Sequence, residues 1–111
     1  MDKERSSQLF ISLVYTWQMQ AMIQLGKIAN PVDGSSQRDL DAAQVTIDIL
    51  DMLKEKTLNN LNDNEKRFLE QTISDLKLNY VDERNKPEAS ESSDNTAEEL
   101  KKESEEGQSK D

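Results

Sequence analysis

The sequence of 111 residues contains no cysteine and no histidine. The chain therefore has no disulfide, no thiolate nucleophile and no imidazole base, and it lacks the usual ligands for zinc and haem. Ser12 and Thr16 fall within a predicted helix and have no base beside them that could activate their hydroxyls. We expect a protein that is not an enzyme and that uses no cofactor and no metal ion.

Basic residues are scarce as well, with 14 lysines and arginines against 23 aspartates and glutamates, and the formal net charge is −9. This charge would repel a nucleic-acid backbone, since no basic cluster offsets it. The apolar run Leu9–Tyr15 is followed by Gln18, Gln20 and Gln24, which interrupt its extension into a membrane span, and no signal-peptide cleavage site follows it. We expect a cytoplasmic protein that binds no nucleic acid and has no integral membrane span.

The composition changes after Asp82. Residues 83–111 contain only Ala89, Ala97 and Leu100 as apolar members, and acidic residues outnumber basic ones among them. A segment of this kind cannot form a core, which predicts a disordered acidic tail over 83–111. Residues 1–82 are predicted to form one domain, because a chain of this length has room for a single hydrophobic core.

Turn and cap residues divide this domain into helices. A first helix is predicted over 7–26, with Ser6 or Ser7 as its N-cap and Gly26 as its stop. The segment Asn30–Gly34 holds a proline and a glycine at turn positions, so we expect the chain to reverse there.

Two further helices follow. The second is predicted over 40–57, with Asp39 placed to accept hydrogen bonds from its first free amides. Asn62 and Glu65 have the spacing of a capping box and open a third helix that continues to about Val81. The predicted fold class is all-α, with a helical hairpin and a third helix.

The three predicted helices differ in how much of their circumference is apolar. The third carries one apolar stripe, the second is apolar on two sides, and the first has no continuous polar face. A unit of this size buries only about 60% of its unfolded surface, so it cannot cover all of these side chains. We therefore expect a homodimer or small homo-oligomer, a dimeric helical bundle with the first helix at its centre. The candidate residues for the self-interface or a partner are Phe10, Leu13, Val14, Trp17, Met19, Ala21, Met22, Ile49, Met52 and Leu53.

Five segments together carry a family resemblance: Phe10–Tyr15, Met19–Gly26, Asn30-Pro31, Thr46–Thr57 and Asp75–Val81. Through them the region Leu9–Val81 resembles a family of small bacterial proteins catalogued as domain of unknown function 1844. The resemblance implies a bacterial helical protein and assigns it no activity. The chain departs from the family pattern at Leu58-Asn59-Asn60, where a glycine is expected before the Asn-Leu pair.

The predicted second helix carries an acidic strip made of Asp41, Asp48, Asp51 and Glu55. Four carboxylates in line are compatible with a divalent cation site or an acid and base pair. A solvated helix face is the simpler interpretation, because a cation site needs oxygens that converge from several elements.

Two other features also have two interpretations. Trp17 with Met19, Met22 and Met52 could line an adaptable groove for a client helix, but such residues more often belong to a core or a self-interface. The Asn30–Gly34 turn could display a binding determinant, or it could serve only as a connector.

The leading functional hypothesis is a helical interaction or adaptor module of the bacterial cytoplasm, which self-associates and binds another protein. The alternative is a small chaperone-like protein whose first helix binds a hydrophobic client or a membrane surface, although that helix lacks the basic face typical of interfacial helices. A carboxylate or metal enzyme is the third hypothesis, with the acidic strip as its site.

Overall fold

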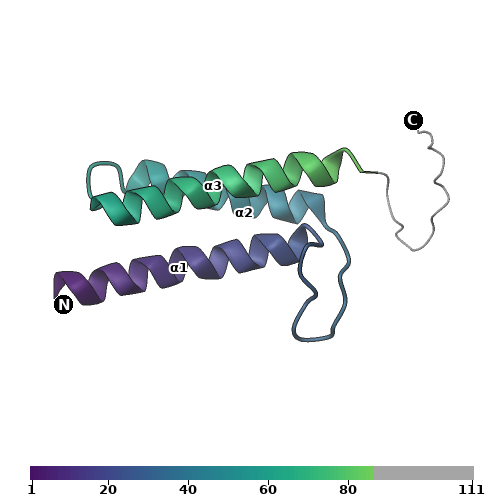
Figure 1. Cartoon of the computed structure of the whole chain (residues 1–111), viewed down its shortest axis with the longest axis horizontal. Helices are drawn as coiled ribbons and strands as arrows, with labels where there is room; N and C mark the ends of the chain where they lie inside the picture. Colours follow the sequence, from purple (N-terminus) through teal and green to yellow (C-terminus); the bar gives the residue numbers. More distant parts are fainter. Residues whose placement is uncertain (87–111) are drawn as a thin grey trace.

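The computed structural model describes residues 1–86, which form three helices: α1 (Lys3–Gln24), α2 (Leu40–Lys56) and α3 (Asp63–Arg84). Figure 1 shows α1 and α3 running in the same direction and α2 running against both. Each helix packs against the other two. The predicted all-α fold of three helices is confirmed for the described residues, whereas the predicted tail, apart from residues 83–86, lies outside them.

Polar caps begin each helix. The prediction that α1 starts near Ser7 is wrong by about one turn, because Asp2 is the N-cap and its carboxylate accepts a hydrogen bond from the Arg5 amide at 2.7 Å. Asp39 caps α2 as predicted and accepts from the Ala42 amide at 3.1 Å.

The capping box at the start of α3 is also confirmed. The Asn62 side chain accepts from the Glu65 amide at 2.8 Å, and the Glu65 side chain accepts from the Asn62 amide at 2.9 Å. At its other end α3 continues through Arg84, two residues beyond the predicted domain boundary. Glu83 is therefore part of the folded unit, and its burial gives it a structural role there.

Nine apolar side chains form the buried core, three from or adjoining each helix. In α2 and α3 they recur at spacings of four and three residues, which places them on one side of each helix. They are Val14, Ala21, Leu25, Ala43, Ile47, Leu50, Leu69, Ile73 and Leu76.

Each of the two connections between helices contains a residue in the left-handed backbone conformation. After α1, Gly26 has φ +80°, and a Cβ at that position would lie 3.4 Å from the Arg38 Cβ. In the short connection from α2 to α3, Asn59 has φ +66°. Asn59 is the position at which the family resemblance leads us to expect glycine. The backbone there keeps the left-handed conformation that glycine adopts most easily, and the Cβ of asparagine makes this conformation less favourable.

We predict that Asn59→Gly stabilises the protein, because glycine adopts the left-handed conformation without the Cβ clash. The free energy of unfolding should rise by about 0.5 kcal/mol, measured by urea denaturation followed by circular dichroism. Asn60→Gly, one residue later and without a positive φ, is the matched control and should lower stability. Equal effects of the two substitutions would contradict the assignment of strain to Asn59.

Candidate interaction surface

The side of α2 that faces α3 is marked by two ion pairs. Asp51 lies 3.0 Å from Lys77, and Lys54 lies 3.9 Å from Glu70. Val45, Ile49 and Met52 recur at spacings of four and three residues, and they lie on the side of α2 turned away from these pairs. α2 therefore carries an apolar stripe that α3 does not cover.

The side of α1 that faces α2 is marked by Gln24, whose side chain accepts a hydrogen bond from the Thr46 hydroxyl at 2.6 Å. Leu13 lies three helical turns before Gln24 and on the same side of α1, and Leu9 lies one turn before Leu13. These leucines therefore adjoin the stripe on α2.

We call the resulting apolar surface the α1–α2 face. Four of its side chains are between 44% and 57% exposed, and its other members are partly buried beside them. Exposed apolar residues gathered on one side are a feature of interaction surfaces, whereas scattered ones are normal. The face consists of Leu9, Leu13, Trp17, Val45, Ile49, Met52 and Leu53.

The candidate residues from the sequence separate into three groups in the structure. Leu13, Trp17, Ile49, Met52 and Leu53 come together on the α1–α2 face. Val14 and Ala21 are fully buried, so they belong to the core of the protomer and offer no surface to a partner. Phe10 is partly buried and packs against the same core.

Met19 and Met22 form the third group. They share a side of α1 with the exposed Tyr15, well around the helix from Leu13. The groove suggested by Trp17 with Met19, Met22 and Met52 therefore does not form as one site.

Two members of the α1–α2 face, Leu9 and Val45, were not among the candidate residues from the sequence. The spacing of Val45 from Ile49 and Met52 was a signal for Val45.

The acidic strip of α2 does not converge on one point. Asp51 pairs with Lys77, and Asp48 accepts a hydrogen bond from the Gln44 amide group at 2.9 Å. Within residues 1–86, no three acidic side chains gather closely enough to hold a metal ion. The strip is a solvated face in this part of the chain. None of the described helices is long and apolar enough to cross a membrane.

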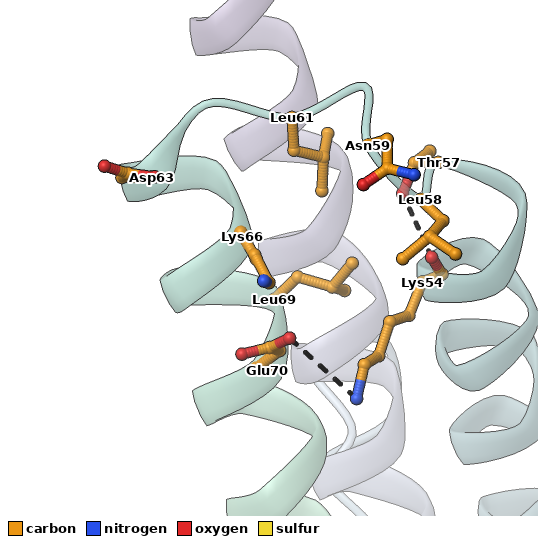
Figure 2. Close-up of a pocket in the computed structure, with 9 residues that line it drawn as sticks. All are labelled: Lys54, Thr57, Leu58, Asn59, Leu61, Asp63, Lys66, Leu69 and Glu70. Carbon is orange, nitrogen blue, oxygen red and sulfur yellow. Dashed lines mark hydrogen bonds and ion pairs between the residues drawn. The ribbon is translucent and has the colours of Figure 1, made fainter.

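A groove lies where α2 turns into α3 (Figure 2). Leu61 and Leu69 point into it, Lys54 and Glu70 pair at its rim, and Asp63 points away from it. Its volume of about 230 Å³ is below the range of roughly 300–1,000 Å³ typical of small-molecule sites. We regard it as a surface hollow of the α2–α3 connection.

The predicted Asn30–Gly34 turn is confirmed. The Gly34 amide donates to the Asn30 carbonyl at 2.7 Å, and the Val32 amide donates to the Asn30 side chain at 2.8 Å. Val32 at the tip is 92% exposed. The turn is thus held by hydrogen bonds among its own residues, and its functional role stays a hypothesis.

A charged cluster around Glu83 fixes the opposite end of the bundle. The Lys27 ammonium lies 2.8 Å from Asp82 and 2.9 Å from Glu83, and the Arg38 guanidinium donates to the Glu83 carbonyl at 2.7 Å and to its carboxylate at 3.2 Å. Lys86 also lies 2.9 Å from the Glu83 carboxylate. The cluster joins the ends of the α1–α2 connection to α3.

The ion pairs around Glu83 shift the pKa of its carboxyl group. Burial by itself raises the pKa of Glu83, but the hydrogen bonds from Lys27, Lys86 and Arg38 outweigh it and hold that pKa below the ordinary value. The hydrogen bond to Asp82, followed by the hydrogen bond to Glu83, raises the pKa of Lys27. Both groups are therefore charged at neutral pH, as an ion pair requires.

Comparison with known proteins identifies one match. Residues 7–83 match the model of a family described as "Domain of unknown function (DUF1844)". No curated protein and no solved structure matches the chain.

We predict that Glu83 makes the protein sensitive to acid. A carboxyl with a lower pKa in the folded state stabilises the fold above its unfolded pKa of about 4.3, and that contribution is lost as pH falls through the folded value. Glu83→Gln should lower the free energy of unfolding by about 1–3 kcal/mol at neutral pH and by less near pH 3. Urea denaturation across this range measures both effects. Glu55→Gln, an exposed site on α2, is the control, and equal pH dependence in the wild type and Glu83→Gln would contradict the prediction.

Proposed function

Because the chain belongs to the DUF1844 family, whose description assigns no activity, we propose a function from its surface: a non-enzymatic interaction module that self-associates and binds another protein of the bacterial cytoplasm. The observation that carries this proposal is the α1–α2 face. It gathers exposed apolar side chains from α2 and from α1, the helix with the least polar circumference.

Exposed leucine, valine and methionine side chains support self-association on energetic grounds. Covering each side chain removes apolar surface from water, which is favourable. A two-fold contact buries the same side chains in both copies. The partly buried Trp17 supplies the kind of aromatic anchor that is enriched in interfaces.

The proposed absence of enzymatic activity rests on side-chain chemistry. The sequence offers no thiol and no imidazole, and the Thr16 hydroxyl donates to the Ser12 carbonyl of its own helix at 2.9 Å. That hydroxyl is engaged with the backbone, as threonine commonly is inside a helix.

We predict that the full chain is a dimer with about twice the protomer mass of 12.7 kDa, measured by light scattering coupled to size-exclusion chromatography over a wide concentration range. A monomer at every concentration would overturn self-association.

Met52→Glu tests which surface carries the contact. It places a charge on the α2 part of the α1–α2 face and should raise the dimer dissociation constant on the order of a hundredfold. The helical circular dichroism signal should persist, because Met52 is 44% exposed in the protomer. Leu78→Glu is the matched control on the outer side of α3, where Leu78 is 69% exposed, and it should leave the dimer intact. If Leu78→Glu dissociated the dimer and Met52→Glu did not, the contact would lie on α3.

A further inference from the structure

We propose that the α1–α2 connection and the last turn of α3 open together as one unit that Glu83 holds closed, while the three helices otherwise stay packed. The connection comprises residues 26–39, and Figure 1 shows it as a loop that leaves the end of the bundle and returns to it. The inference adds a conformational device to the fold and does not rest on the proposed self-association. It follows from what attaches the connection to the helices.

Apolar packing does not hold the connection. None of residues 26–39 belongs to the buried core or to the partly buried apolar side chains packed against it, whereas Leu25 just before the connection and Leu40 just after it do. Residues 31–37 are exposed throughout, and Val32 at their tip is 92% exposed. A segment with few buried apolar contacts opens at a lower free energy than the core.

One carboxylate binds both ends of the connection. Lys27, its second residue, lies 2.9 Å from the Glu83 carboxylate, and Arg38, next to its last residue, lies 3.2 Å from the same group. The Glu83 side chain is only 10% exposed, so the loss of either cation leaves a buried carboxylate less well paired. Each contact closes the loop that the other needs, which raises the effective concentration of the second cation near Glu83. We therefore expect the two contacts to form and break together.

The last turn of α3 depends on the same contacts. The final carbonyl groups of a helix have no partner further along it, and the Arg38 guanidinium donates to the Glu83 carbonyl at 2.7 Å. It also places a positive charge near the C-terminal end of the helix, where the helix dipole favours one. Release of Arg38 therefore frees the connection and weakens the end of α3 at the same time.

Two backbone amides report separately on the two segments. The Asp39 amide at the end of the connection donates to the Gln24 carbonyl of α1 at 2.7 Å. The Asn85 amide after α3 donates to the Val81 carbonyl at 3.1 Å. Both hydrogen bonds slow exchange with solvent deuterium while the unit is closed. The Ile73 amide in the middle of α3 belongs to a core residue and serves as the reference.

Amide hydrogen exchange of the full chain, followed by NMR, tests whether the unit exists. In the wild type, Asp39 and Asn85 should both have protection factors at least about tenfold below that of Ile73. Exchange of Asp39 as slow as that of Ile73 would overturn the proposal, because the connection would then open only when the whole chain unfolds.

Lys27→Met tests what holds the unit closed, because it removes a cation from the start of the connection and keeps a side chain of similar length. Exchange at Asp39 and at Asn85 should accelerate by the same factor, roughly tenfold, although neither is a sequence neighbour of residue 27. Acceleration of only one of the two amides would overturn the proposal, since the segments would then open separately. Lys54→Met, which removes the ion pair with Glu70 at the other end of the bundle, is the matched control and should leave both amides unchanged.

Ile47→Val tests whether the helices stay packed when the unit opens. Ile47 is buried in the core on α2, and the loss of one methylene group there should accelerate exchange at Ile73 by roughly fivefold. Asp39 and Asn85 should keep their wild-type rates, because the core contacts of Ile47 remain in the open form. Equal acceleration at all three amides would mean that only the complete fold opens, and it would contradict the proposal. A joint response of Asp39 and Asn85 to Lys27→Met, with none to Ile47→Val, supports it.

Discussion

The fold depends on a core of nine buried apolar side chains that must hold three helices together. Each helix turns one side toward this core, and a helix of some ten residues or more has several other sides. For α3 the remaining circumference is mostly polar, although Leu78 and Val81 stay exposed on it. For α1 and α2 it is not, and apolar side chains stay exposed after the protomer has folded. The α1–α2 face is thus a consequence of packing three helices of unequal polarity around one small core.

Polar contacts fix what the core leaves undetermined, namely where the helices begin and how the connections lie. Asp2, Asp39 and Asn62 satisfy the first amides of the three helices. At the end of α3 the buried Glu83 draws in Lys27 and Arg38 from the two ends of the long connection. A buried carboxylate with its cations is costly to disrupt, because removing one partner leaves the other buried and unpaired. The connection is therefore held at its base while the tip around Val32 remains exposed.

The proposed interaction surface and this charged cluster lie in different parts of the unit. The side chains of the α1–α2 face are apolar, and two of them, Trp17 and Leu53, also pack against the core, whereas the side chains around Glu83 form ion pairs with one another. The cluster and the core therefore maintain the protomer, and the proposed association uses the face instead.

Sequence analysis predicted the features that depend on residues close together in the chain. Three helices, the Asp39 cap, the capping box of Asn62 and Glu65 and the Asn30–Gly34 turn follow from local hydrogen bonding and backbone preferences. Helix periodicity could also have separated Trp17 from Met22, because their positions around α1 depend only on their spacing. The surplus of apolar surface on the first two helices was predictable from helix periodicity, but which of its side chains stay exposed was not.

Which apolar residues are covered follows from how the three helices pack together. Val14 and Ala21 are buried while Leu9, Leu13 and Val45 are exposed, because coverage depends on which side of each helix meets its neighbours. The burial of Glu83 could not be predicted from the sequence either. Glu83 belongs to the segment 83–111, whose composition predicts a tail, and it is nevertheless buried. Its partners Lys27 and Arg38 lie far away in sequence, and such a contact exists only once α1, α2 and α3 have packed.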